Sequence, residues 1–253
     1  MIKFDLPENP KKTGIATDFD GTISKIRQNQ AEAIIDEQAK ELLLKLSNCY
    51  RTVSIISGRP VKQLAQTVDI KGVFYIGNHG AEYLHNSHYQ LLQEAIDVEP
   101  VIAKIYSEQK NKYSEFDFDY KKYSLAIHYR RHKHPEEAEK KIKELLEKYL
   151  TPQLKIQKGR MVYDIGPKNI NKGLAINRLV NKYELEYFLY VGDDRTDIDA
   201  FKQMKNLEAK GIRTIKIALL SKEAPKGLVE NSDIQIESLA QLNSLFRELL
   251  KQC

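Results

Sequence analysis

Segments typical of a β-strand and of an α-helix alternate near both ends of this 253-residue chain. The expected strands lie near residues 14–17, 52–56, 73–76, 187–191, 214–219 and 233–236. The expected helices cover residues 36–46, 60–68, 172–182, 197–210 and 238–251, with Asn171 as the cap of the third. A strand, a helix and another strand in this order form a parallel sheet with right-handed crossovers. The pattern therefore predicts the α/β class, with a Rossmann-like parallel-sheet core.

This alternation breaks in the middle of the chain. Helices are expected there at 99–110 and 135–150, and short strands at 116–120, 124–129, 154–157 and 161–165. The order is helix, strand, strand, and then the same again, which predicts an inserted α+β cap domain. We expect the first part of the core domain at 1–81, the cap domain at 82–164 and the second part of the core domain at 165–253.

Composition and charge exclude several classes of protein. Hydrophobic residues make up 42% of the chain and charged residues 30%, which is typical of a folded globular protein. The formal net charge of +5 mildly favours an anionic ligand. Charges of both signs alternate at helical spacing over residues 136–143, as on a solvated helix face. Because no basic stripe of one sign stands out, we expect no nucleic-acid partner.

The sequence contains no apolar stretch long enough to span a membrane, and its first residues lack the layout of a secretory signal. We therefore expect a cytoplasmic protein without a membrane partner. We also expect a monomer. Its two cysteines, Cys49 and Cys253, lie far apart in the sequence and show no metal-ligand spacing. Both are expected to be free thiols.

Acidic residues directly follow two of the expected core strands. Asp18 and Asp20 follow the first strand, and Asp193 and Asp194 follow the strand at 187–191. Open α/β sheets place their ligands where the carboxyl ends of parallel strands meet, so these acids are expected to converge. A simple turn is the alternative for one isolated Asp-x-Asp-Gly. Two acid clusters at one edge repel each other unless a cation is bound, and hard oxygen ligands of this kind suit Mg²⁺.

Two more polar residues are expected at the same edge of the sheet. Ser57 follows the strand at 52–56 and offers a hydroxyl donor. Lys172 follows Asn171 and offers a positive charge beside a helix N-terminus, where anions are favoured. Acids, a hydroxyl, a lysine and a helix N-terminus together predict a site for phosphoryl transfer.

Four segments resemble the motifs of haloacid dehalogenase-like phosphatases. They are Asp18-Phe19-Asp20-Gly21-Thr22, Ser57-Gly58-Arg59, Lys172-Gly173 and Gly192-Asp193-Asp194-Arg195-Thr196-Asp197. Three further segments, at 77–82, 127–130 and 197–201, are similar to those of the trehalose-6-phosphate phosphatase family. The resemblance covers about residues 14–201. It implies a haloacid dehalogenase-like fold and a magnesium-dependent phosphatase that converts trehalose 6-phosphate to trehalose and phosphate.

The resemblance also implies how the catalytic residues act. Asp18 is the expected nucleophile, which forms an aspartyl-phosphate intermediate. Asp20 is expected to protonate the leaving sugar oxygen and then to activate water. Ser57 and Lys172 are expected to hold the phosphoryl oxygens, because a carboxylate attacks a phosphate dianion only when charge is neutralised.

The implied magnesium ligands are Asp18, the backbone oxygen of Asp20, and Asp193. Asp194 and Asp197 are expected to orient these groups. Direct binding of the metal by either of these two acids remains an alternative.

The residues expected to bind the sugar phosphate lie in the core motifs and in the inserted segment. They are Gly58, Arg59, His79, Glu82, Arg130, Arg160 and Asp164. Family members often carry Gly-Lys-x-x-x-Glu where this chain has Gly-Arg-Met-Val-Tyr-Asp at 159–164. Since these positions are implied sugar contacts, another sugar phosphate is the alternative substrate: mannosyl- or glucosyl-3-phosphoglycerate, or sucrose 6-phosphate.

Overall fold

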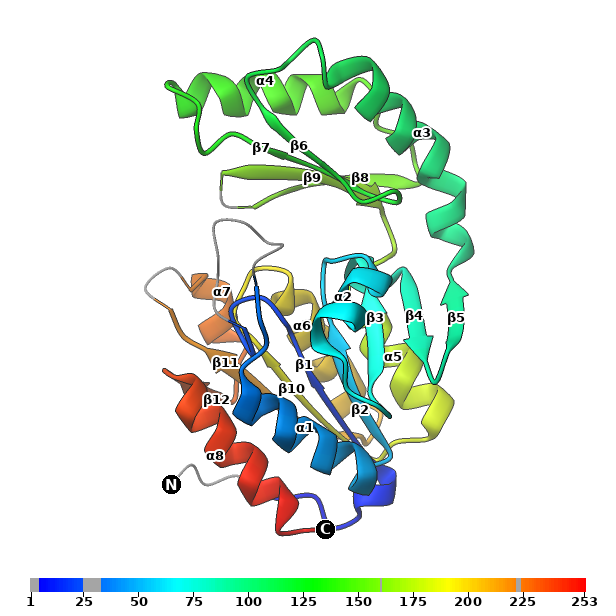
Figure 1. The fold of residues 1–253 in the computed structure, drawn as a ribbon, viewed down its shortest axis with the longest axis vertical. Coiled ribbons are helices and arrows are strands. Elements are labelled where there is room, and N and C mark those ends of the chain that lie inside the picture. Colours follow the sequence, from blue (N-terminus) through cyan, green and yellow to red (C-terminus); the bar gives the residue numbers. More distant parts are fainter. Residues whose placement is uncertain (1–4, 25–32, 160, 222–223) are drawn as a thin grey trace. The chain divides into compact units, whose positions relative to one another are not determined.

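The computed structural model describes residues 5–24, 33–159, 161–221 and 224–253 (Figure 1). The chain forms two compact units, which are Met1–Gln90 together with Asn171–Cys253, and Leu91–Ile170. We call the first the core domain and the second the inserted domain. The inserted domain begins later than the predicted 82 because residues 82–91 form two strands of the core sheet.

The core domain contains an eight-stranded sheet in the order β12-β11-β10-β1-β2-β3-β4-β5. The strands are β1 (Thr13–Thr17), β2 (Thr52–Ile56), β3 (Phe74–Gly77), β4 (Glu82–His85), β5 (His88–Leu91), β10 (Tyr187–Gly192), β11 (Arg213–Leu219) and β12 (Ile234–Ile236). All neighbours from β12 to β3 are parallel, and β4 is antiparallel to β3. The predicted parallel α/β core is therefore confirmed.

Helices cover both faces of this sheet (Figure 1). They are α1 (Glu37–Cys49), α2 (Val61–Val68) and α8 (Leu239–Leu250) on one face, and α5 (Lys172–Tyr183), α6 (Asp197–Glu208) and α7 (Lys226–Glu230) on the other. Ile15 and Ala16 follow each other on β1 and point to opposite faces, and each is 0% exposed. Burial on both faces explains why the central strands are almost continuously apolar.

A side-chain cap fixes where α5, the helix that carries Lys172, begins. The Asn171 side chain accepts a hydrogen bond from the backbone N–H of Leu174 at 2.8 Å, which confirms the predicted cap of α5. Lys172 is therefore the first residue of the helix. A short 3₁₀ segment, η3 (Asn78–Gly80), directly follows β3. It therefore lies at the edge of the sheet where β3 ends.

The inserted domain has a four-stranded antiparallel sheet in the order β6-β7-β9-β8. Its elements are α3 (Gln93–Gln109), β6 (Asp117–Tyr120), β7 (Leu125–His128), α4 (Pro135–Glu147), β8 (Leu154–Lys158) and β9 (Val162–Pro167). The predicted order of two helix-strand-strand units is confirmed. Alternate residues of β7 and β9, such as Ile127 and Ile165, pack in one apolar cluster with both helices, so Ala126 and Asp164 lie on the opposite face of the sheet.

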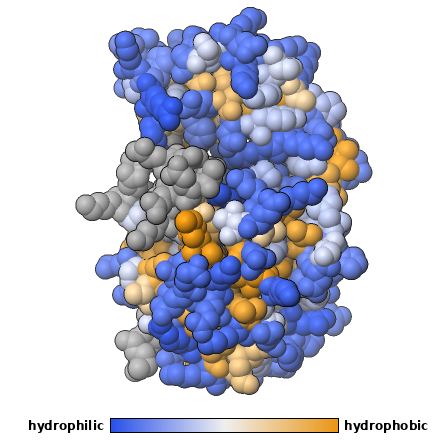
Figure 2. All heavy atoms as spheres, in the orientation of Figure 1, coloured by the Kyte–Doolittle hydropathy of each residue, from blue (hydrophilic) through white to orange (hydrophobic). Residues whose placement is uncertain are grey.

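Charged residues lie on the solvated faces of the helices, as predicted for 136–143. In α4, Ala138 and Ile142 are buried while most of the charged residues between and around them are exposed. Figure 2 accordingly shows hydrophilic residues over much of the visible surface. Within the described ranges, no helix is both long and apolar enough to cross a membrane.

The prediction of two free thiols was wrong, because Cys49 and Cys253 form a disulfide with Cα atoms 5.8 Å apart. Packing of α8 against α1 brings the two cysteines together across 204 residues. The Tyr50 hydroxyl adds a 2.8 Å hydrogen bond to the backbone oxygen of Leu249. Spacing in the sequence carries no signal of this pairing, since it depends on how the two helices pack.

Candidate active site

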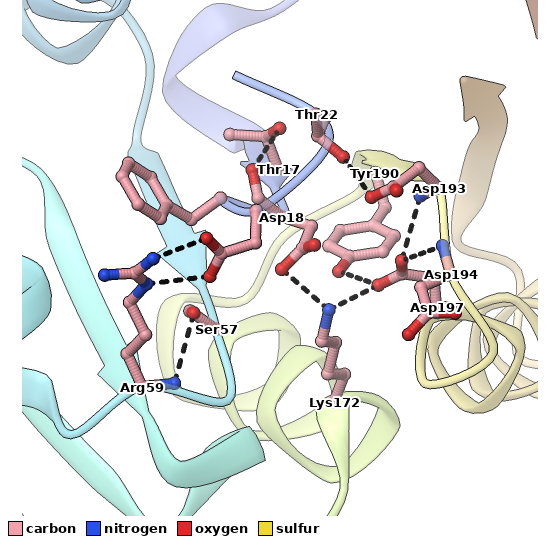
Figure 3. A network of polar contacts seen from close by, with 12 residues as sticks. Thr17, Asp18, Thr22, Ser57, Arg59, Lys172, Tyr190, Asp193, Asp194 and Asp197 are labelled. Carbon is pink, nitrogen blue, oxygen red and sulfur yellow. Dashed lines mark hydrogen bonds and ion pairs between the residues drawn. The ribbon is translucent and has the colours of Figure 1, made fainter. Parts of the chain in front are cut away.

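The first acid cluster meets the second because β1 and β10 are neighbours in the sheet. Thr17 pairs with Val191 in parallel register, and the backbone N–H of Asp18 donates to the oxygen of Val191 at 2.9 Å. Both strands therefore end at the same level, with Asp18 after one and Asp193 after the other (Figure 3). The structure thus brings Asp18 and Asp193 together, as predicted, whereas the Asp194 side chain is exposed.

Lys172 joins two acids in the buried centre of the site. Its Nζ lies 2.8 Å from Oδ1 of Asp18 and 2.6 Å from Oδ1 of Asp197. Burial by itself lowers the pKa of Lys172, but the two carboxylates raise it above its usual range, so the side chain is an ammonium ion. Burial also raises the pKa of Asp18, and Lys172 opposes this shift.

Asp197 uses both of its oxygens to organise the site. Oδ1 accepts hydrogen bonds from Lys172 and from the Tyr190 hydroxyl, each at 2.6 Å. Oδ2 accepts from the backbone N–H groups of Asp193 and Asp194, each at 2.9 Å. These contacts occupy the lone-pair positions of the carboxylate. Asp197 therefore orients its neighbours, whereas the Asp194 side chain is exposed.

Two glycines and a threonine shape the surroundings of Asp193. The Thr22 hydroxyl donates to Oδ1 of Asp193 at 2.9 Å. Gly21 has φ +87°, and a Cβ there would lie 2.2 Å from Oδ2 of Asp193. A Cβ at Gly192 would lie 2.3 Å from the Asp197 carboxyl carbon. Side chains at these positions would displace the acids.

The buried acids fit a divalent cation. Asp18, Asp193 and Asp197 each place one carboxylate oxygen within 4.8 Å of the others. Lys172 is a single positive charge among three buried carboxylates, and burial followed by the charge of Asp18 raises the pKa of Asp193. Since Asp197 already accepts four hydrogen bonds, Asp18 and Asp193 are the side chains best able to hold a metal.

Asp20 lies beside this cluster and is paired with Arg59. Its Oδ2 accepts from Nε at 2.7 Å and its Oδ1 accepts from Nη2 at 2.6 Å. The Arg59 guanidinium lies over the Phe19 ring, with the carbon 4.9 Å from the ring centroid. The side chain of Asp20 thus faces an arginine, and only its backbone oxygen is left to serve as the predicted metal ligand.

The loop after β2 brings Ser57 and Gly58 to the same edge. Ser57 Oγ accepts a hydrogen bond from the backbone N–H of Arg59 at 3.2 Å. A Cβ at Gly58 would lie 2.6 Å from the His79 ring, so that ring packs directly on the glycine. His79 itself has φ +57°, in the left-handed region, as part of η3.

Glu82 is buried and forms hydrogen bonds within the core domain. Its Oε2 accepts from the backbone N–H of Val61 at 3.1 Å and from the Asn78 amide at 2.6 Å. Its Oε1 accepts from the Tyr89 hydroxyl at 3.0 Å. Val61 is the first residue of α2, so Glu82 satisfies an N–H at a helix N-terminus. In this structure it joins β4 to α2, and a contact with substrate stays a prediction.

The model of the trehalose-phosphatase family matches residues 16–227. The chain belongs to this family. Its match includes both acid clusters, Ser57 and Lys172, and it extends through the whole inserted domain. Membership agrees with the resemblance read from the sequence motifs.

Plant proteins are among its relatives within the family. A probable trehalose-phosphate phosphatase 3 of Oryza sativa subsp. japonica is 30% identical over 237 residues, covering 82% of this chain and 63% of the relative. Trehalose-phosphate phosphatase B of Arabidopsis thaliana is 29% identical over 255 residues, covering 92% of this chain and 65% of the relative. The chain therefore spans less than two thirds of the length of either relative.

Solved structures show the same fold. The C-terminal domain of the C. albicans trehalose-6-phosphate phosphatase matches with a TM-score of 0.78 at 22% identity, covering 96% of this chain and 94% of that one. A haloacid dehalogenase-like hydrolase from Bacteroides thetaiotaomicron matches with a TM-score of 0.66 at 14% identity, covering 94% and 99%. The predicted haloacid dehalogenase-like fold is thereby confirmed.

The inserted domain carries the other residues that the family resemblance assigned to the sugar. Arg130 follows β7 and is exposed. Asp164 lies on β9, opposite Ala126 on one side and Gln157 on the other. Arg160 lies outside the described residues. The roles of all three toward substrate stay predictions.

Two contributors to the site were not foreseen from the sequence. Tyr190 is fully buried on β10 and reaches Asp197, and Thr22 reaches Asp193. The available signal for Tyr190 was a phenol in an otherwise apolar strand, because a buried hydroxyl needs a partner. The pairing of Arg59 with Asp20 was not foreseen either, since Arg59 was assigned to substrate.

Proposed function

We propose that this chain is a phosphatase that hydrolyses trehalose 6-phosphate to trehalose and phosphate through an aspartyl-phosphate on Asp18. The observation that carries the chemistry is the buried set in which Lys172 bridges Asp18 and Asp197 beside Asp193. Family membership and the names of the plant relatives support trehalose 6-phosphate as the substrate.

In the first step, an oxygen of Asp18 attacks phosphorus, and the bond from phosphorus to the sugar oxygen breaks. Lys172 holds Oδ1 of Asp18 at 2.8 Å, which leaves the other carboxylate oxygen for the attack. Asp20 gives its proton to the leaving sugar oxygen. Lys172 and the Ser57 hydroxyl donate to phosphoryl oxygens as negative charge builds up.

In the second step, Asp20 acts as a base. It takes a proton from a water molecule that attacks phosphorus, and the bond from phosphorus to Asp18 breaks. The products are inorganic phosphate and the free Asp18 carboxylate. Asp20 is then protonated again and ready for another turnover, so proton transfer balances over the cycle.

The proposed cofactor is Mg²⁺, held by Asp18, Asp193 and the backbone oxygen of Asp20. Hard carboxylate and carbonyl oxygens are the donors this ion prefers. When bound, it supplies positive charge that neutralises the acids and the phosphate dianion. The cluster of three buried carboxylates around the single positive charge of Lys172 supports this assignment.

The sugar-binding residues, the oligomeric state and the location are also proposed. Gly58, His79, Glu82, Arg130, Arg160 and Asp164 are the proposed contacts to the small-molecule sugar phosphate, whereas Arg59 is bound to Asp20. A monomer and a cytoplasmic location stay predictions from the sequence. The Cys49–Cys253 disulfide argues against the cytoplasmic location, because disulfides persist mainly in oxidising compartments.

The test is phosphate release from a panel of phosphorylated sugars in the presence of magnesium. The panel contains trehalose 6-phosphate, sucrose 6-phosphate, glucose 6-phosphate and the two 3-phosphoglycerate sugars. We expect kcat/KM for trehalose 6-phosphate to exceed that for glucose 6-phosphate by about tenfold or more, because a smaller substrate leaves polar groups unpaired. Preference for a phosphoglycerate sugar would replace trehalose 6-phosphate as the assigned substrate. If no sugar phosphate of the panel released phosphate, the proposed activity would be overturned.

A further inference from the structure

We propose that Arg59 is a positioning residue that holds the Asp20 carboxylate in the orientation needed for proton transfer. This inference rests on the proposed function, because it deepens the role of Asp20. It differs from the role that the family resemblance gives to Arg59, which is contact with the substrate.

The two side chains meet through a paired contact. Nε and Nη2 of Arg59 lie 2.7 and 2.6 Å from the two oxygens of Asp20. A guanidinium fork bound to both oxygens fixes the position of a carboxylate and also the plane in which it lies. The remaining nitrogen, Nη1, is buried without a hydrogen-bond partner among the described residues.

Arg59 is anchored much more firmly than Asp20. Its side chain is 3% exposed, whereas that of Asp20 is 35% exposed. The guanidinium packs over the Phe19 ring, and the backbone oxygen of Arg59 accepts a 2.8 Å hydrogen bond from the N–H of Asn78. The arginine is therefore the fixed member of the pair, and the half-buried carboxylate of Asp20 is the one that can turn toward substrate.

This asymmetry suits an acid that must meet a leaving oxygen. Proton transfer requires the carboxyl oxygen to lie within hydrogen-bond reach of the atom it protonates. Once one oxygen of Asp20 has taken up a proton, the carboxyl group needs only a small rotation: the unprotonated oxygen keeps its bond to Arg59 while the protonated oxygen turns to the sugar. Lysine at this position keeps the charge but cannot hold both oxygens in one plane.

The experiment compares leaving groups. A sugar oxygen is a strongly basic leaving group and needs the proton of Asp20, whereas p-nitrophenolate is weakly basic and leaves without it. The first step is measured as the rapid burst of p-nitrophenol from p-nitrophenyl phosphate, and overall turnover is measured with trehalose 6-phosphate. Wild type, Arg59→Lys and Arg247→Lys are compared, since Arg247 is an exposed arginine on α8.

For Arg59→Lys we expect kcat on trehalose 6-phosphate to fall roughly 10- to 100-fold, in the range of general acid–base effects, with KM changed by less than about threefold. The burst rate with p-nitrophenyl phosphate should stay within about threefold of wild type, and Arg247→Lys should match wild type in both assays. In an Asp20→Asn background, Arg59→Lys should add no further loss, because the two residues act through one step. Arg59→Gln replaces the lysine variant if that variant does not fold.

Equal losses on both substrates, or a raised KM with an unchanged kcat, would overturn the proposal and make Arg59 a substrate contact. An additive loss in the Asp20→Asn background would also overturn it. Failure of the proposed function would give a different result, because wild-type protein would release p-nitrophenol from p-nitrophenyl phosphate but no phosphate from any sugar phosphate. The Arg59 comparison then uses an alkyl phosphate as the substrate with the basic leaving group.

Discussion

Lys172 and Asp197 form a buried ion pair, with Nζ 2.6 Å from Oδ1 and side chains 2% and 0% exposed. Asp197 also accepts hydrogen bonds from the backbone N–H groups of Asp193 and Asp194. One carboxylate thus fixes the lysine that touches the expected nucleophile, and it fixes the turn that carries the expected metal ligand. The site is organised from a residue that does not itself need to contact substrate.

Substitution of Asp197 should therefore damage both stability and activity. Asp197→Asn leaves Lys172 with one fewer acidic partner in a buried place, and removing one member of a buried pair typically costs about 3–5 kcal/mol. Urea unfolding followed by circular dichroism measures this loss, and phosphate release measures activity. Asp194→Asn is the matched control, because the Asp194 side chain is exposed, and it should change stability by less than about 0.5 kcal/mol. Equal effects of the two variants would contradict the organising role of Asp197.

Removal of divalent metal should stop turnover. Asp18 and Asp193 place excess negative charge where a phosphate dianion must bind, so we expect activity to be lost in EDTA and restored by added magnesium. A thermal shift on adding magnesium to the metal-free protein gives a readout independent of activity, and Asp193→Asn should reduce that shift. Full turnover in EDTA would show that the protein neutralises this charge without a metal.

The disulfide should stabilise the core domain without serving the reaction. Cys49 and Cys253 close a loop across 204 residues, and loss of such a link typically lowers the free energy of unfolding by about 2–4 kcal/mol. Cys253→Ser should show this loss in denaturant unfolding, and a reducing agent should lower wild type to the same level while leaving the variant unchanged. An unfolding midpoint unaffected by reductant would mean that the bond contributes nothing to stability.

Acid should destabilise the inserted domain through His128. Burial lowers the pKa of this histidine on β7 below its usual value of 6.5. A base with a lowered pKa in the folded state contributes stability above the unfolded pKa, and that contribution is lost as the pH falls through the folded pKa. Between pH 7.5 and 5, His128→Gln should reduce the slope of stability against pH, by at most about 1.4 kcal/mol per pH unit.

The matched control for this prediction is His134→Gln, since His134 is an exposed histidine of the same domain. It should leave the slope of wild type unchanged. If the two variants behave alike, the acid sensitivity has another origin than burial of His128.

The parallel core could be predicted because strand ends carry strong local signals. A buried strand that runs into Asp18, and another that runs into Asp193, gave both the sheet edge and the site. The hairpin of β4 and β5 was not predicted. Its loop residues Asn86 and Ser87 have φ +46° and +67°, a backbone typical of two-residue hairpin loops. Its second strand is mostly exposed, so it lacks the apolar pattern that marks core strands.

The remaining features depend on packing between distant segments. Arg59 meets Asp20 only because the loop after β2 lies beside the loop after β1, and sequence motifs give the residues without their pairing. The Cys49–Cys253 bond likewise depends on the packing of α8 on α1. Single-sequence patterns report local periodicity, whereas these contacts are set by the tertiary arrangement.

Covalent phosphorylation of Asp18 tests the central claim most directly. Asp20→Asn protein, which lacks the base for the second step, is mixed with magnesium and p-nitrophenyl phosphate, whose leaving group departs without the proton of Asp20. The mixture is quenched in acid and digested for mass spectrometry. The account predicts one phosphoryl group on the peptide at Asp18, none in Asp18→Asn, and loss of turnover in Asp18→Asn despite an intact fold. An unmodified Asp18 together with near-normal turnover by Asp18→Asn would contradict it and indicate direct attack by water.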